Sequence, residues 1–412
     1  MSEVSEVLER HQRHVNRTAA GFQTLMGVGL EVSSSGSQVR DQDGNAYLDC
    51  GGYGVFFLGH CHPRVVEAVV DQVRRHPLST HALVEPHVSA AAEALSAVAP
   101  AGLDYVSFTT SGADAAELGL KLARANGRRR VVAMDGSYHG MSMGALSVTA
   151  REHYREPFQP LLPDVQFVPH GDLERLEAAL AGGEPAAVIV EPVQGEAGVR
   201  IPPDGYLRGV RRLCDEHGGL LIADEIQTGL GRLGAWWGCA AEDVVPDVLL
   251  AGKTLGGGVM PVGAVVARPD VFEVLNSQPT LHLTTFGGSP LAAVAAATTV
   301  AVLREEGLVE RARALGERLL PALREIASRR CPNLIQEVRG RGLLIGVELV
   351  GPRLAALMYA ALLRRRVVAG FARVLRLFPS AVMTDAEVDW LLDAFDGAAA
   401  EVTERVAARV GV

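Results

Sequence analysis

The chain has 412 residues, enough for one large domain and a smaller one. Its 48% hydrophobic and 21% charged residues are ordinary for a globular enzyme, and the net charge of −9 argues against a nucleic-acid partner. The polar start of the chain does not resemble a signal peptide. The longest apolar run, residues 290–303, is short and rich in alanine, so we expect a core helix and no membrane association.

The five cysteines lack a CxxC spacing, which indicates reduced thiols and a cytoplasmic protein. The triplet His60-Cys61-His62 falls in a turn and has no second cluster of ligands, so we expect no metal site.

The N-terminal fifth of the chain predicts small structural units. Residues 1–20 indicate a polar, partly helical leader placed to lie on a partner subunit. An Asp-Gly turn within residues 38–49 separates two short strand patterns and predicts a hairpin. Helices are expected at Arg64–Arg75 and His87–Val98.

Short apolar runs then alternate with helical patterns, which is typical of an α/β protein with a doubly wound sheet. The predicted strands are Tyr105–Thr109, Val131–Met134, Val165–Val168, Ala187–Val190, Leu220–Ala223, Val248–Ala251 and Val262–Ala267. The predicted helices between them include Ala113–Ala125, Leu173–Leu180 and Gly205–His217. After Ser289 two long helices, Leu291–Glu306 and Val309–Arg329, precede strands near 335–339 and 343–349, which predicts a separate α+β domain.

Two of the predicted strands end in residues that carry chemistry. The run Leu220–Ala223 ends in Asp224, and the run Val248–Ala251 is followed by Lys253. Ligands of open α/β sheets lie outside the carboxyl ends of strands. An amine there can form a Schiff base with pyridoxal 5′-phosphate (PLP), and a carboxylate can keep the pyridine nitrogen protonated. The plain alternative is a buried ion pair between the two side chains.

The sequence segments around these residues, ADEIQTGLGRLG and AGKTLGGG, resemble those of the class III (ornithine/4-aminobutyrate/putrescine-type) aminotransferases. The resemblance extends from about Gly36 to Pro379. The resemblance implies PLP fold type I: a large α/β domain with a mostly parallel central sheet and a smaller α+β C-terminal domain. It implies an N-terminal segment at 1–45 that joins the small domain, the PLP-binding domain at 46–290 and the small domain at 291–412. It also implies transfer of an amino group from an amine or ω-amino compound to a keto acid.

The resemblance assigns cofactor-binding roles to matching residues. In the family, the segment matching Ser111, Gly112 and Ala113 binds the cofactor phosphate, although Ser111 could also be an ordinary helix N-cap. In the family, the residue matching Tyr138 stacks on the ring, that matching Glu191 lies near the cofactor, and His139 would give support. Asp224 would bond the ring nitrogen and Gln227 the phenolic oxygen. Lys253 would form the Schiff base and shuttle the proton. For Tyr138 the plain alternative is a core tyrosine with a satisfied hydroxyl.

The resemblance also assigns residues to the partner subunit and the substrate. Thr285 matches a residue that reaches the phosphate of the neighbouring subunit, which implies a homodimer with shared active sites. Glu196 matches a residue that pairs with an arginine, here Arg376, and releases it when a dicarboxylic partner binds; a surface salt bridge is the plain alternative for Arg376. Tyr53 matches a tyrosine at the substrate entrance.

The chain departs from the family in two places that bear on the substrate. Met141 stands where members that bind 4-aminobutyrate or ornithine carry an arginine, so we expect a donor with no carboxylate on that side. The segment between Glu348 and Arg376 is short and holds Arg364-Arg365-Arg366 and Arg373. These arginines are either a solvated helix face or a basic rim for an anionic substrate.

Two alternatives to transamination remain open from the sequence. Racemases, decarboxylases, enzymes of elimination or replacement, and carbon–carbon bond-forming enzymes share this scaffold. A non-catalytic domain that retains the fold is the other alternative, and the intact Lys253, Asp224, Gln227 and Thr285 argue against it.

Overall fold

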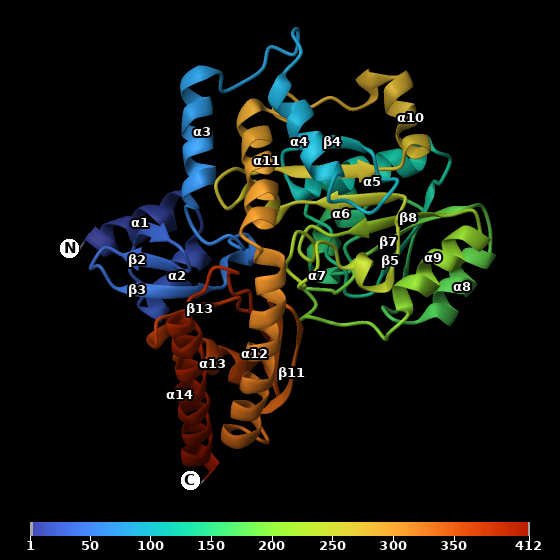
Figure 1. The fold of residues 1–412 in the computed structure, drawn as a ribbon. Coiled ribbons are helices and arrows are strands. Elements are labelled where there is room, and N and C mark those ends of the chain that lie inside the picture. Colours follow the sequence, from blue (N-terminus) through green and yellow to red (C-terminus); the bar gives the residue numbers. More distant parts are fainter. Residues whose placement is uncertain (1–2, 411–412) are drawn as a thin grey trace.

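A seven-stranded sheet forms the centre of the larger region in this computed structural model, which describes residues 3–410 (Figure 1). Its order is β4-β10-β9-β8-β7-β5-β6. The strands are β4 (Tyr105–Thr109), β5 (Arg130–Met134), β6 (Val165–Val168), β7 (Ala186–Val190), β8 (Leu220–Asp224), β9 (Val248–Ala251) and β10 (Gly263–Ala267). Only β10 runs antiparallel to its neighbours in this sheet, so the prediction of a mostly parallel sheet is confirmed. The predicted strand bounds agree with these to within one residue.

The continuous apolar runs arise because both faces of this sheet are covered. Along β8, Leu220 and Ile222 belong to the core beneath α5 (Gly112–Ala125), whereas Leu221 belongs to the core on the opposite face. That second face is covered by helices that include α8 (Leu173–Ala181) and α9 (Tyr206–Glu216). Because side chains alternate between the two faces and both faces are covered, every residue of β8 is buried.

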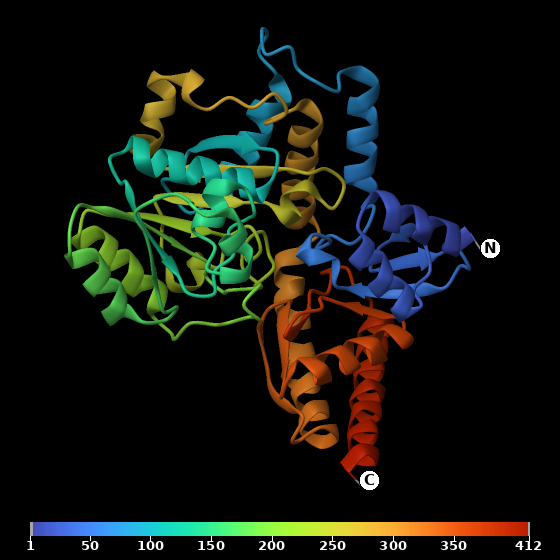
Figure 2. The same ribbon diagram turned by 180° about the vertical axis from the view of Figure 1, so that it is seen from behind.

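The N-terminal part of the chain builds a second sheet together with a strand from the C-terminal region. Helices α1 (Glu3–His14) and α2 (Arg17–Met26) precede β1 (Glu31–Ser35), β2 (Gln38–Asp41) and β3 (Ala46–Cys50). The predicted hairpin is confirmed, since β2 and β3 pair antiparallel. Strand β13 (Val367–Ala369) pairs parallel with β3, and Figures 1 and 2 show the blue N-terminal segment beside the red C-terminal region.

The C-terminal region contains a third, antiparallel sheet of order β11-β12-β14. Its elements are α12 (Leu308–Arg330), β11 (Ile335–Arg341), β12 (Leu344–Leu349), α13 (Pro352–Arg364), β14 (Val374–Leu377) and α14 (Asp385–Val410). The preceding helix α11 (Pro290–Glu305) packs on α3 (Pro63–Arg75) and α4 (Pro86–Ser96), whereas α12 packs on α14 and β11. The change of packing partners thus falls near Gly307, and the boundary at residue 290 stays a prediction. Residues 1–2 and 411–412 of the predicted domains lie outside the described residues.

The remaining helices are short or peripheral: α6 (Met143–Ser147), α7 (Glu152–Arg155) and α10 (Pro269–Ser277). Within residues 3–410, no helix combines the length and apolar character that crossing a bilayer requires.

Candidate active site

Asp224 ends β8 and is held there by hydrogen bonds to both carboxylate oxygens. His139 Nδ1 lies 2.6 Å from Asp224 Oδ2, and the backbone N–H of Ile226 donates to Oδ1 over 3.1 Å. An ionised carboxylate can only accept, so His139 is the donor. Burial alone would lower the pKa of His139, but the hydrogen bond and charge of Asp224 outweigh it and raise that pKa. Asp224 is therefore a fixed, buried acceptor with only 4% of its surface exposed.

Lys253 follows β9, the strand beside β8. Because Asp224 lies opposite Leu250 in this parallel pair, the two strands end at the same edge of the sheet. The lysine backbone has φ of 42°, a left-handed conformation that costs roughly 1–3 kcal/mol in a residue with a side chain and that clusters at active sites. The plain alternative of an Asp224–Lys253 ion pair is wrong, since Asp224 pairs with His139 instead.

The Lys253 amine is poorly hydrated. Loss of hydration lowers its pKa to about 8, against the opposing attraction of Glu196, Asp224 and Glu191. An amine with this pKa is partly neutral near physiological pH and can act as a nucleophile or a base.

Glu191 and Tyr138 lie on the wall next to the histidine. The backbone N–H of Tyr138 donates to Glu191 Oε1 over 3.0 Å. Burial raises the pKa of Glu191 to about 7 and also raises the pKa of the Tyr138 hydroxyl. The Glu191 carboxyl is consequently poised to exchange a proton near neutral pH.

These groups surround one cavity of about 280 Å³. Among the predicted site residues, those that line it are Gly112, Ala113, Tyr138, His139, Met141, Glu191, Glu196, Asp224, Gln227 and Lys253. The structure thus brings together side chains from the ends of several strands of the large sheet.

Four predicted residues do not line this cavity. Ser111 begins α5 and its Oγ accepts the Asp114 N–H over 3.2 Å, which is the N-cap geometry of the plain alternative. Tyr53 is 79% exposed. Thr285 is exposed, and its carbonyl oxygen lies 3.2 Å from His81 Nε2. Arg376, on β14, forms an ion pair with Glu196 on the cavity wall and is only 6% exposed, so it is not a surface salt bridge.

Several residues that position the site escaped the sequence analysis. Ile226 lines the cavity and fills the space that Gly112 leaves, since a Cβ at Gly112 would lie 2.9 Å from its side chain. Thr149 Oγ1 accepts the His139 N–H over 2.9 Å, and Glu117 accepts two N–H groups at the start of α6. Ile226 stands inside the DEIQTG motif, which was a usable signal; nothing local marks the other two.

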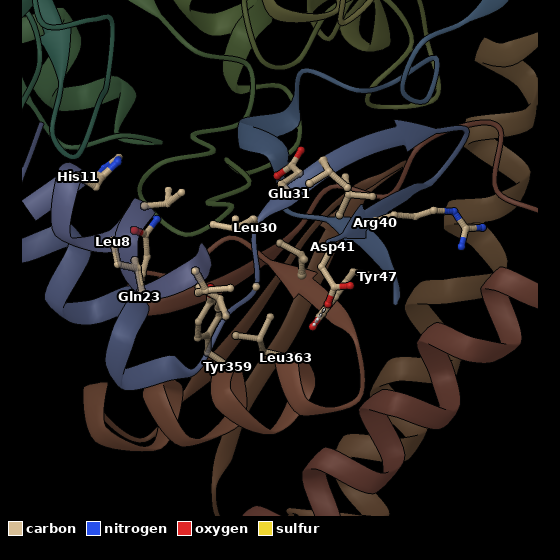
Figure 3. Close-up of a pocket in the computed structure, with 17 residues that line it drawn as sticks. Leu8, His11, Gln23, Leu30, Glu31, Arg40, Asp41, Tyr47, Tyr359 and Leu363 are labelled. Atoms are coloured by element: carbon tan, nitrogen blue, oxygen red, sulfur yellow. Dashed lines mark hydrogen bonds between the residues drawn. The ribbon is translucent and has the colours of Figure 1, made fainter. Parts of the chain in front are cut away.

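Another concavity, of about 670 Å³ and thus larger than this cavity, lies elsewhere (Figure 3). It opens between the N-terminal helices and the β1-β2-β3-β13 sheet, where Leu8, Leu30, Tyr359 and Leu363 supply apolar surface. None of the predicted site residues lines it. We assign the reaction to the smaller cavity because its polar groups converge there with a perturbed amine and carboxyl.

The residues present fit PLP. The amide oxygen of Gln227 is buried without a hydrogen-bond partner among the described residues, as expected of a group that faces an absent polar ligand. The N-terminus of α5, which is 14 residues long, presents free N–H groups to the same cavity and suits a phosphate. Lys253 would supply the amine, and Asp224 would supply a fixed acceptor for a protonated ring nitrogen. No group of three or more potential metal ligands occurs in the part of the chain that the structure describes.

A mostly parallel sheet with a strand-end lysine and a neighbouring strand-end aspartate defines a PLP enzyme of fold type I. The sequence profile of the class-III aminotransferases matches residues 28–399, and the chain belongs to this family. It is therefore a PLP-dependent aminotransferase.

Solved structures agree with this assignment. The chain is 31% identical to the ornithine aminotransferase of Toxoplasma gondii, with a TM-score of 0.88 over 98% of this chain and 99% of that one, and that structure is described as having PLP at partial occupancy in its active site. It is 28% identical to a thermostable (S)-enantioselective omega-transaminase from Thermomicrobium roseum, with a TM-score of 0.91 over 98% and 99% of the two chains. It is 29% identical to the ornithine δ-aminotransferase of Plasmodium falciparum, with a TM-score of 0.82 over 94% and 99%.

Proposed function

We propose that this aminotransferase takes an amino group from an amine or ω-amino compound and delivers it to a keto acid, with Lys253 as the reacting amine. One observation carries the proposal: Lys253, the Asp224–His139 pair and Gln227 meet in a single cavity. When bound, PLP supplies an aldehyde for the amino group and a ring that accepts electrons.

Lys253 has two roles in this proposal. Its Nζ would hold the cofactor at rest, and the amine, when free, would be the group that accepts a proton from the substrate carbon and returns it. The pKa of about 8 serves both roles, because the amine is neutral often enough to accept a proton and acidic enough to return it.

The neighbouring residues hold the cofactor in place. Asp224, oriented by His139, would keep the proton on the ring nitrogen, and the Gln227 amide would bond the phenolic oxygen. Tyr138 would pack on the ring. Ile226 also lines the cavity with an apolar surface, and both side chains would exclude water from the reacting atoms.

The phosphate is held by the turn before α5 and by a second copy of the chain. Ser111, Gly112 and Ala113 supply N–H and hydroxyl donors at the helix N-terminus. Thr285 lies away from its own cavity, which supports a role in the site of a partner and hence a homodimer. The free state of all five cysteines supports a cytoplasmic location.

Two walls select the substrates. Met141 is apolar and 46% exposed, so the donor presents no carboxylate there, and Tyr53 lies at the entrance. On the other wall, Glu196 occupies Arg376 until a keto-acid carboxylate replaces it. Burial would raise the pKa of Glu196, yet the Arg376 charge lowers it, so the pair is ionised at neutral pH.

The test is a half-reaction with an amine donor alone. We expect the visible absorbance of the PLP enzyme to disappear in proportion to the ketone or aldehyde released, and a keto acid to restore it. Borohydride should couple the cofactor to the peptide that contains Lys253, whereas the Lys253→Met variant should remain uncoupled. Product release with no change in absorbance would instead identify another PLP reaction.

A further inference from the structure

A second concavity, of about 400 Å³, adjoins the catalytic cavity. Glu196, which forms the ion pair with Arg376, lines both of them. One side of the second concavity is the loop at residues 196–200, and the other includes the turn at 372–374 that leads into β14. These two segments are in tight contact, because a Cβ at Gly198 would lie 2.6 Å from the Val374 side chain.

The charged side chains that line this concavity are four arginines and two glutamates. They are Arg151, Arg200, Arg339, Arg373, Glu196 and Glu348. Both glutamates are already neutralised, Glu196 by Arg376 and Glu348 by Arg339, whose Nη1 lies 2.6 Å away. The other donors of Arg339 bond the carbonyl oxygens of Gly198 and Val199.

Three guanidinium groups are thereby left without a carboxylate: Arg151, Arg200 and Arg373 have no ion pair among residues 3–410. For Arg364, Arg365, Arg366 and Arg373 the sequence left two alternatives open, a solvated helix face or a basic rim. Arg365 is 2.8 Å from Glu401, which also pairs with Arg364, and Arg366 donates to Asn45. Arg364, Arg365 and Arg366 thus have partners at the end of α13. Of these four arginines, Arg373 is the one that lines the second concavity.

The fold positions two of the three unpaired arginines, the exposed Arg200 and the half-buried Arg151, whereas Arg373 is exposed at the rim. The backbones of Gln194 and Arg200 exchange two hydrogen bonds of 3.0 Å, which closes the loop that carries Arg200. Gly136, at φ of 79°, leaves room for that guanidinium, since a Cβ there would lie 3.1 Å from Arg200 Nη1. The Nε and Nη2 atoms of Arg151 are buried and have no hydrogen-bond partner among the residues that the structure describes. Buried guanidinium donors without acceptors are costly, so those of Arg151 indicate an absent anionic ligand.

We propose that Arg151, Arg200 and Arg373 form an anion subsite that binds the distal phosphate or carboxylate of an extended amino substrate. The proposal rests on the proposed function, since it extends the same reaction to a substrate class: amines whose far end carries an anion. The planar fork of arginine matches two oxygens of either group. Met141, on the wall of the catalytic cavity, cannot bind such an anion. The anionic end of the substrate would therefore point toward the three arginines.

The first experiment measures anion binding without catalysis. The PLP enzyme is reduced with borohydride, which keeps the cofactor phosphate site filled, and inorganic phosphate is titrated by calorimetry. We expect saturable binding that weakens about tenfold in each of Arg151→Gln, Arg200→Gln and Arg373→Gln, since each loses a charged hydrogen-bond donor. Arg353→Gln, an exposed arginine on α13 outside the concavity, is the matched control and should bind as the parent does. Equal binding in all four variants would overturn the subsite.

The second experiment compares matched amines in the donor half-reaction: an aminoalkanol, its phosphate ester and the aminoalkanoate of equal length. We expect kcat/KM to be highest for a charged amine, and the ratio of charged to neutral amine to fall about tenfold in Arg373→Gln but not in Arg353→Gln. A preference for the ester over the carboxylate identifies phosphate as the anion. No preference for either charged amine would overturn the proposal. If no amine discharges the absorbance, the proposed function fails, whereas the phosphate titration still decides the anion subsite.

Discussion

Lys253 and Glu191 show how the fold sets proton affinities residue by residue. Burial lowers the pKa of the amine to about 8 and raises the pKa of the carboxyl to about 7. The two values approach each other from opposite sides because loss of hydration penalises the charged form of each group. Both groups therefore gain or lose a proton close to neutral pH.

The depressed lysine pKa makes the stability of the cofactor-free protein depend on pH. The folded pKa lies below the unfolded value of 10.5, so this contribution to stability is present above about pH 10.5 and is lost as the pH falls through about 8. The free energy of unfolding of the parent, relative to Lys253→Met, should rise by about 2–3 kcal/mol from pH 7 to pH 10. Urea unfolding of both apo proteins at the two pH values measures this. A difference that does not change with pH would contradict the assignment.

Strand β10 lies unusually close to the turn that follows β4. Gly263 lies opposite Thr109, and a Cβ there would come within 2.3 Å of the Ser111 carbonyl oxygen. The clash is with backbone, so no side-chain rotation can relieve it. The glycine thus allows the antiparallel strand to lie against the N-terminus of α5, where the cofactor phosphate is proposed to bind.

Gly263→Ala should push this turn away from the sheet. We expect a loss of roughly 1–3 kcal/mol in the free energy of unfolding, as for other overpacked sites, together with weaker PLP binding. Gly21→Ala on α2 is the control, because a Cβ there meets no atom within 4 Å and the change should be neutral or stabilising. Chemical denaturation and titration with PLP measure the two effects. Unchanged PLP affinity in Gly263→Ala would argue against the phosphate site at this turn.

Arg232 joins the parts of the whole molecule. It is fully buried and donates to the carbonyl oxygens of Leu343 and Pro379 in the C-terminal region and of Gly54 near the N-terminal sheet. Its guanidinium carbon also lies 4.9 Å from the centre of the Phe57 ring. Burial lowers the pKa of Arg232 to about 9, yet the group stays charged at neutral pH. One side chain from the large sheet region thereby fixes segments from three parts of the chain.

Arg232→Met should leave these carbonyls buried without donors. We expect a loss of about 3–5 kcal/mol in the free energy of unfolding, the scale of breaking a buried charged network from one side. The exposed Arg304→Met on α11 serves as control and should change the stability by less than about 0.5 kcal/mol. Urea unfolding followed by circular dichroism compares them, and similar midpoints for the two variants would refute the role of Arg232.

The strands and the sheet edge that carries Lys253 and Asp224 were predictable because their signals are local. An apolar run bounded by turn residues specifies a buried strand, and the carboxyl ends of parallel strands must meet at one edge. The residue types at these ends then restrict the chemistry. Tyr138, Glu191 and Gln227 followed from the family resemblance, and the structure places them around the same cavity.

The remaining features depend on contacts between distant segments. His139 reaches Asp224 across 85 residues of sequence, β13 joins the N-terminal sheet, and Arg373 separates from the arginines at 364–366 that precede it closely in the chain. No local pattern encodes these outcomes, because packing decides which buried polar groups share a space. The sequence by itself determined the sheet, the cofactor class and the lysine that we propose as the reacting amine. Only the tertiary structure decided which charged side chains form ion pairs and which do not, because that depends on contacts between distant segments.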